Sequence, residues 1–135
     1  MPLIVWSDDF RFGIEEIDTQ HQQLFSLINE LHDAMAHGKG KSITAEVLDA
    51  LVSYTVKHFS TEELLMQAHR YAGLWEHRAS HQKFTATVVQ FQKAYKDGSA
   101  TLNIDIMEFL RQWLVTHIQG TDRKYVPILK DASAN

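Results

Sequence analysis

The stretch of residues 56–69, VKHFSTEELLMQAH, combines the spacing of an amphipathic helix with two polar residues on its apolar side. The apolar stripe of the stretch consists of Val56, Phe59, Leu65 and Met66. His58 and Glu62 lie beside this stripe and are four residues apart, so they differ by about 40° around the helix axis and point the same way. Because a buried polar group without a partner costs roughly 1–3 kcal/mol, the stretch predicts a helix that brings a polar site into the core.

The chain outside this stretch reads as three further helices with the same kind of pattern. Sparse glycines at positions 38, 40, 73 and 98 separate the segments, and the apolar spacing between them is helical. We expect an all-α, up-down-up-down antiparallel four-helix bundle in one domain that spans residues 1–135. The predicted parts are an extended arm (1–17), four helices (18–37, 42–70, 74–97 and 103–119) and a C-terminal tail (120–135) that is irregular or forms a short last turn. Asp18, directly after the arm, is predicted to be the N-cap of the first helix.

Polar residues on the helical stripes fall at matching heights of this bundle. His21 is near the start of the first helix, and His117 is near the end of the fourth. The other members are His58 and Glu62 in the last third of the second helix, and His77 and His81 near the start of the third. Since neighbouring helices are antiparallel, all six positions meet in one layer at one end. The three remaining histidines lie off the stripes or near helix ends and are expected to be solvated.

A metal site is the arrangement that satisfies this layer. Each neutral imidazole has one donor and one acceptor, so five imidazoles and a carboxylate cannot satisfy one another, whereas all of them donate lone pairs to a metal ion. The pairs His58/Glu62 and His77/His81 together offer more ligands than one tetrahedral ion needs, which favours two metals. Asp122 would lie about 140° further round than His117 on a continued helix, although Gly120 permits a change of path, so the spacing leaves its participation open.

These residues carry a resemblance to a known family. The pattern is similar to that of hemerythrins, more narrowly of stand-alone bacteriohemerythrins, from Trp6 to about Pro127. The residues that carry it are Trp6, Gly13, Ile17-Asp18-x-Gln20-His21, His58-Phe59-x-x-Glu62, His77-x-x-x-His81 and His117-x-x-x-x-Asp122.

The resemblance implies a non-haem centre of two iron ions per chain with an oxo or hydroxo bridge. By the family pattern His77, His81 and His117 hold one iron, His21 and His58 hold the other, and Glu62 and Asp122 bridge both. This leaves one coordination position open on the second iron, where dioxygen binds in the family. The residues that flank the ligands by one, three or four positions are expected to form an apolar oxygen pocket, namely Leu24, Phe59, Trp113, Leu114 and Ile118.

Reversible dioxygen binding, as a carrier or store, is therefore the predicted function, and we expect no enzymatic activity. Di-iron enzymes in helical bundles carry Glu-rich sites with paired Glu-x-x-His motifs, whereas this chain offers five histidines and two carboxylates. The alternatives are a di-iron oxidase or peroxidase, and a sensor of oxygen, iron or nitric oxide that acts through a separate partner.

The amino-acid composition limits the possible binding partners and the expected cellular location. The 135 residues contain no cysteine, which excludes disulfides and thiolate metal sites, and the net charge of −4 argues against sequence-independent nucleic-acid binding. The apolar opening MPLIVW is too short for a signal peptide or a membrane span. We expect a cytoplasmic monomer whose ligand is dioxygen, and an oxygen-consuming enzyme is a partner that this function would suit.

Overall fold

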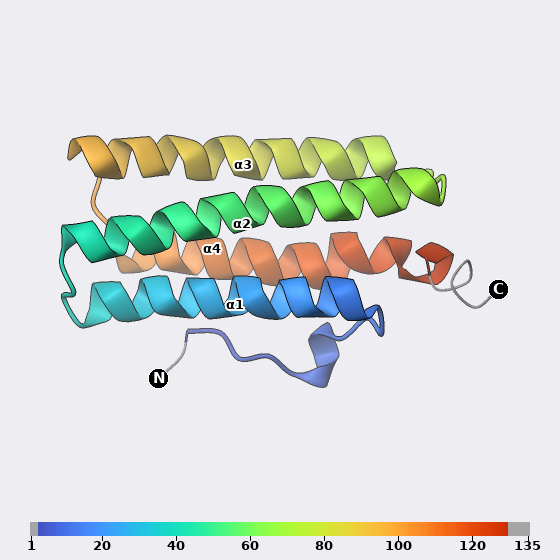
Figure 1. Cartoon of the computed structure of the whole chain (residues 1–135), viewed down its shortest axis with the longest axis horizontal. Helices are drawn as coiled ribbons and strands as arrows, with labels where there is room; N and C mark the ends of the chain where they lie inside the picture. Colours follow the sequence, from blue (N-terminus) through green and yellow to red (C-terminus); the bar gives the residue numbers. More distant parts are fainter. Residues whose placement is uncertain (1–2, 130–135) are drawn as a thin grey trace.

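Four helices with short connections form an antiparallel bundle (Figure 1). They are α1 (Glu15–Ala36), α2 (Lys41–Ala68), α3 (Leu74–Asp97) and α4 (Ile104–Thr116). The computed structural model describes residues 3–129, and no strand occurs in that part of the chain. Each helix runs opposite to the one before it (Figure 1), so the predicted up-down-up-down all-α bundle is confirmed.

The helix ends that follow familiar capping chemistry lie close to their predicted positions. Gly98 adopts a left-handed backbone with φ 87° directly after α3, a conformation that ends helices and that glycine adopts without strain. Asn103 precedes α4, and its side chain accepts a hydrogen bond from the N–H of Ile106 at 3.0 Å. These two residues turn the chain from α3 into α4.

The start of α1 differs from the prediction. The helix begins at Glu15, and Asp18 lies inside it instead of capping it. The Asp18 carboxylate accepts hydrogen bonds from the N–H groups of Phe12 at 2.8 Å and Gly13 at 3.0 Å. The Asp18 carboxylate therefore accepts hydrogen bonds from the loop before the helix, and not from the helix N-terminus as an N-cap would.

The N-terminal arm runs along α1 (Figure 1) and is less uniformly extended than predicted. Asn29 of α1 holds it through both polar atoms of its side chain, since Oδ1 accepts from the N–H of Ile4 and Nδ2 donates to the carbonyl of Ile4. A short 3-10 turn, Asp8–Phe10, interrupts the arm before α1.

The end of α4 also differs from a continued α-helix. A π-helical turn, His117–Thr121, follows α4, and a 3-10 turn, Asp122–Tyr125, follows that. Residues 126–129 are helical as well, so this part of the predicted tail is ordered, while residues 130–135 lie outside the described part of the chain.

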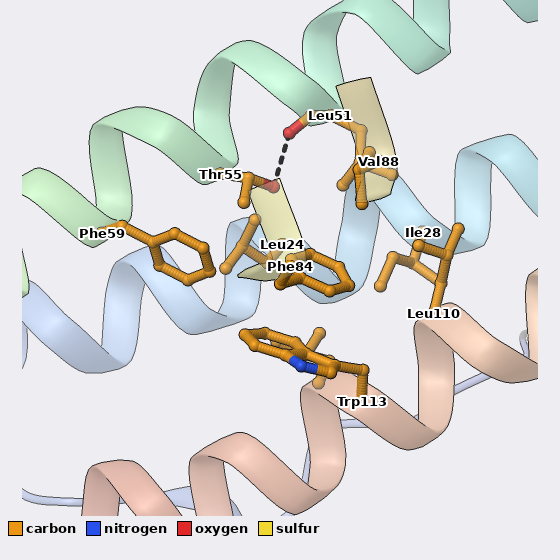
Figure 2. Close-up of a pocket in the computed structure, with 10 residues that line it drawn as sticks. Leu24, Ile28, Leu51, Thr55, Phe59, Phe84, Val88, Leu110 and Trp113 are labelled. Atoms are coloured by element: carbon orange, nitrogen blue, oxygen red, sulfur yellow. Dashed lines mark hydrogen bonds between the residues drawn. The ribbon is translucent and has the colours of Figure 1, made fainter. Parts of the chain in front are cut away.

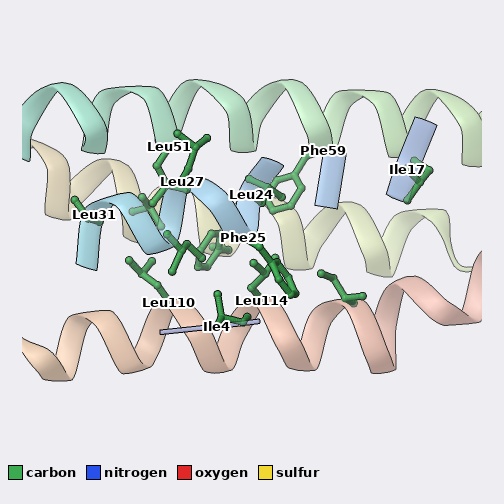
Figure 3. Packing of buried hydrophobic residues seen from close by; sticks show 14 of the residues in the cluster. Ile4, Ile17, Leu24, Phe25, Leu27, Leu31, Leu51, Phe59, Leu110 and Leu114 are labelled. Carbon is green, nitrogen blue, oxygen red and sulfur yellow. The ribbon is translucent and has the colours of Figure 1, made fainter. Parts of the chain in front are cut away.

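Leucine-rich packing fills the bundle between the helices (Figure 3). Leu31 of α1, Leu48 of α2 and Met107 of α4 are at most 1% exposed and lie toward the end of the bundle where α1 finishes and α2 starts. Val56 of the opening stretch is an exception to its predicted place on the apolar stripe, because it is 45% exposed. The other end of the bundle is equally buried but polar.

Candidate metal centre

The predicted layer of polar residues forms at the end of the bundle where α1 begins. Its members come from three helices and from the turns that follow the fourth: His21 from α1, His58 and Glu62 from α2, His77 and His81 from α3, and His117 and Asp122 from the turns after α4. None of these seven residues is more than 3% exposed. The fold therefore brings together all of the predicted ligand residues and withdraws them from solvent.

The seven residues form two groups that share both carboxylates. Glu62, His77, His81, His117 and Asp122 make one group, and His21, His58, Glu62 and Asp122 make the other; within each group the potential ligand atoms lie within 4.8 Å of one another. We call these groups the three-histidine position and the two-histidine position. Two positions with common carboxylates are the arrangement that a bridged pair of metal ions needs.

Asp122 faces both positions with different oxygen atoms. Its Oδ1 lies 2.7 Å from Nε2 of His77 and 2.8 Å from Nε2 of His117, whereas its Oδ2 lies 3.1 Å from Nε2 of His21. The π turn makes this possible, because Asp122 donates its backbone N–H to the carbonyl of His117, five residues earlier. The wider turn sets Asp122 beside His117, and Gly120 contributes no positive φ to it.

Glu62 lies across the layer from Asp122. Its Oε1 is 3.1 Å from Nε2 of His58 in one position and 3.3 Å from Nε2 of His81 in the other. Its Oε2 accepts a hydrogen bond from the hydroxyl of Tyr125, a fully buried residue that the sequence analysis did not single out. Tyr125 lies three residues after Asp122, and this spacing was the only sequence signal for its place near the site. The signal can be interpreted only once the helical turn at Asp122–Tyr125 is known.

Several atoms that face the centre of the layer have no hydrogen-bond partner within residues 3–129. They include Nε2 of His58, Oε1 of Glu62, Nε2 of His77 and Oδ1 of Asp122. Buried polar atoms are normally paired, so four unpaired atoms in one layer need an explanation. Nε2 of His58 lies 3.1 Å from Oε1 of Glu62, and Nε2 of His77 lies 2.7 Å from Oδ1 of Asp122, so each pair suits one metal ion in its own position. Nitrogen and oxygen donors of this kind bind divalent iron and zinc. The residues present thus fit a metal centre.

Electrostatics keeps the two carboxyl groups ionised. Burial and the neighbouring Asp122 raise the pKa of Glu62, but the imidazoles of His58 and His81 outweigh them and lower it to about 2. Burial likewise raises the pKa of Asp122, and His117, His21 and His77 together lower it well below its usual range. Carboxylates that remain charged in a dry core need positive charge beside them, which protonated imidazoles or a bound cation can supply.

A hydrogen-bonded chain fixes the orientation of His58. The hydroxyl of Thr61 donates to the carbonyl of Lys57, so its oxygen is free to accept from the side-chain amide of Gln20 at 3.3 Å. The oxygen of that amide then accepts from Nδ1 of His58 at 2.7 Å. Because Nδ1 carries the proton, the lone pair of His58 is on Nε2, which faces the centre of the layer.

A second chain does the same for His81. Its Nδ1 lies 3.0 Å from Oε2 of Glu63, and Oε1 of Glu63 accepts from Nε of Arg78 at 2.8 Å. The sequence analysis gave no role to Gln20, Glu63 or Arg78. Each follows or precedes a ligand by one residue, so it lies about 100° away on the helix and faces a neighbouring helix instead of the core.

An apolar cavity (Figure 2) has a volume of about 20 Å³. It adjoins the polar layer, because Phe59 and Trp113 of its lining contact His81 and His117. Its lining includes Leu24, Phe59, Trp113 and Leu114, four of the five residues that the sequence analysis assigned to an oxygen pocket. The fifth, Ile118, is fully buried but does not line it. The other lining residues are Ile28, Leu51, Thr55, Phe84, Val88 and Leu110. The hydroxyl of Thr55 donates its hydrogen to the carbonyl of Leu51, so Thr55 offers the cavity no hydrogen-bond donor. This volume is enough for one molecule about the size of water.

Two aromatic residues of the cavity also cover the polar layer. Phe59 stacks on His81 with ring centroids 3.8 Å apart, and Trp113 stacks on His117 at 4.3 Å. These contacts fix the planes of two imidazoles and exclude water from that side of the layer.

Comparison with known proteins agrees with this site. Residues 13–129 match the family described as the Hemerythrin HHE cation binding domain. The chain belongs to the hemerythrin family. The expected resemblance to bacteriohemerythrins is confirmed, since the Bacteriohemerythrin of Methylococcus capsulatus is 38% identical over 96% of this chain and 98% of that protein.

Other hemerythrins give similar results. The Bacteriohemerythrin of Pseudomonas aeruginosa is 35% identical over 96% of this chain and 84% of that protein, and the Myohemerythrin of Riftia pachyptila is 37% identical over 90% and 89%. A crystal structure of a wild-type hemerythrin superimposes with a TM-score of 0.90 at 38% identity, covering 94% of this chain and 98% of that one.

Within residues 3–129 no helix is long and apolar enough to cross a membrane.

Proposed function

We propose that this chain binds dioxygen reversibly at a centre of two iron ions. His77, His81 and His117 would hold one iron, and His21 and His58 would hold the other. Glu62 and Asp122 would bridge them, with an oxo or hydroxo group completing the bridge. The observation that carries this proposal is that the seven side chains form two groups with both carboxylates in common.

The unequal number of histidines supports binding at one iron. With three imidazoles, two carboxylate oxygens and a solvent-derived bridge, an ion in the three-histidine position would have six ligands, whereas an ion in the two-histidine position would have five. When bound, the iron pair supplies an open coordination position and the electrons that reversible dioxygen binding requires. Five neutral imidazoles also leave the centre less anionic than the Glu-rich sites of di-iron enzymes, which favours a carrier over an oxidase.

The surrounding residues keep this chemistry reversible. The apolar side chains of Phe59, Trp113 and Leu114 lie beside the polar layer and restrict the entry of water and anions. Tyr125 donates its hydroxyl hydrogen to Glu62 and holds that carboxylate in place. Burial and the nearby carboxylates of Glu62 and Asp122 raise the pKa of Tyr125 well above its usual range, so its proton stays on the hydroxyl.

The test is an anaerobic titration of the metal-free protein with ferrous iron, followed by cycles of air and argon with visible absorption recorded throughout. We expect uptake of about two irons per chain, a colourless reduced form, and a band that appears in air and disappears under argon. One zinc per chain in iron-fed protein, with no oxygen-dependent band, would contradict the metal assignment. Continuous oxygen consumption with turnover would instead identify an oxidase or peroxidase.

The proposed setting is that of a monomer in the cytoplasm that exchanges dioxygen with an oxygen-consuming enzyme. A chain without cysteine suits a reducing compartment, although it does not require one. Sedimentation of the iron-loaded protein at micromolar concentration tests the oligomeric state. A sensor would differ by rapid autoxidation and by a conformational change that accompanies it.

A further inference from the structure

The two proposed iron positions differ in the groups that support their histidines. Within residues 3–129, two of the five imidazoles have a side-chain partner at Nδ1. His58, in the two-histidine position, pairs with the uncharged amide of Gln20, and His81, in the three-histidine position, pairs with the carboxylate of Glu63. The supporting charge therefore lies on one side of the centre.

The pair of Glu63 and Arg78 is built to keep its geometry. Both carboxylate oxygens of Glu63 are engaged, Oε2 with Nδ1 of His81 at 3.0 Å and Oε1 with Nε of Arg78 at 2.8 Å. The side chains of Glu63 and Arg78 are 20% and 30% exposed, so neither is free to sample solvent widely. The guanidinium of Arg78 also lies over the ring of Trp75, with its carbon 5.0 Å from the ring centroid.

The chemistry of a carboxylate decides the tautomer of His81. An ionised carboxylate only accepts hydrogen bonds, so Nδ1 of His81 must carry the hydrogen and Nε2 must carry the lone pair. That Nε2 lies 2.9 Å from Nε2 of His117 and 3.3 Å from Oε1 of Glu62, at the centre of the three-histidine position. A carboxylate on the far nitrogen orients a ligating imidazole and raises its basicity more than an uncharged amide does.

We propose that Glu63, held by Arg78, is a positioning residue that makes His81 a stronger metal ligand than His58, which Gln20 supports without charge. This inference rests on the proposed two-iron function and deepens it. The stronger donor belongs to the three-histidine position, so Glu63 and His81 would hold an iron there more firmly than Gln20 and His58 would hold one in the two-histidine position. Gln20 holds His58 in the correct tautomer and adds no negative charge on the gas-binding side.

The experiment loads the parent and its variants with iron-57 under argon and compares their Mössbauer spectra. Glu63→Gln keeps the size and an acceptor but removes the charge, and Gln20→Ala removes the support of His58. We expect two resolved doublets in the parent, a shift of one doublet in Glu63→Gln, and a shift of the other doublet in Gln20→Ala. We also expect Glu63→Gln to lose iron to a chelator about tenfold faster than the parent, the lower end of the effect of such supporting partners.

Glu76→Gln is the matched control, because Glu76 is an exposed carboxylate beside His77 and the change removes the same charge from the same end of the bundle. The control should leave both doublets and the rate of iron loss unchanged. A Glu63→Gln protein with a lower melting temperature but parental doublets and parental iron loss would show that Glu63 acts on the fold alone, which overturns the inference. A parent that takes up fewer than two irons would overturn the proposed function and this inference with it.

Discussion

The two ends of the bundle are equally buried but are held together differently. At the end where α1 finishes, Leu31, Leu48 and Met107 pack carbon against carbon and require nothing further. At the end where α1 starts, His58, Glu62 and Asp122 are just as inaccessible, yet each has an inward-facing atom without a hydrogen-bond partner among the described residues. The apolar end thus needs no ligand, whereas the proposed cations would complete the polar end, so metal binding and stability should be coupled at one end.

The largest effect should come from a carboxylate that both positions share. Replacing Asp122 by Asn keeps its size but removes the charge and one of the two oxygens that face the imidazoles. We expect iron content to fall from about two per chain to less than one, as measured by elemental analysis after gel filtration. Asp105→Asn, at an exposed site in the first turn of α4, should keep the parental content. An Asp122→Asn protein with two firmly held irons would show that Asp122 is not a bridge.

The next effect separates the two positions within the polar end. His21→Ala removes one of two imidazoles from the proposed gas-binding iron, while His77→Ala removes one of three from the other. Both changes should lower the melting temperature of the iron-loaded protein, but His21→Ala should reduce reversible oxygenation more. Equilibrium oxygen titrations followed by absorption make the comparison. Retained reversible oxygenation in His21→Ala would mean that the open position belongs to the other iron.

A third change tests whether the apolar end is independent of the metal. Leu48→Ala removes a buried side chain and should lower the free energy of unfolding by about 2–5 kcal/mol, with two irons still bound. The same substitution at Leu64, which is on the same helix but 67% exposed, should change stability by less than about 0.5 kcal/mol. Urea unfolding and iron analysis of both proteins suffice. Loss of iron from Leu48→Ala would show that the two ends are not independent.

The smallest effect concerns the boundary between the ends. Leu114 is 5% exposed, lines the cavity and lies one turn before His117, so Leu114→Ala should widen the route to the iron. We expect faster decay of the oxygenated form in air and faster azide binding, with both irons retained. Leu110→Ala enlarges the same cavity one turn further from the metal and should alter these rates less. Equal rates in Leu114→Ala and the parent would make Leu114 ordinary core.

Helical spacing alone was enough to predict the bundle and to place six polar residues in one layer, because an antiparallel bundle fixes their heights. The uncertain residue was Asp122, since its place depends on a π turn, and a local change of helix type leaves little trace in residue spacing. Asp18 was misjudged as a cap because the same carboxylate serves equally well to hold the loop at Phe12 and Gly13.

Supporting contacts were harder to foresee than ligands. Gln20 and Glu63 each bond a histidine of a neighbouring helix. Which residue they contact there depends on side-chain conformation and cannot be read from the helical spacing of the sequence. Ile118 has the expected spacing from the ligands, but it lies in the π turn that begins at His117, and it does not line the cavity. In each case the missing information was the path of the backbone or a rotamer at the edge of a helix.

The central claim is that two metal ions lie in two positions that share Glu62 and Asp122. Its most direct test is anomalous diffraction at the iron absorption edge from crystals of protein loaded with iron under argon. We predict two anomalous peaks per chain, one among His77, His81 and His117 and one beside His21 and His58, with both carboxylates between them. A single peak, or a peak outside these seven residues, would contradict the account.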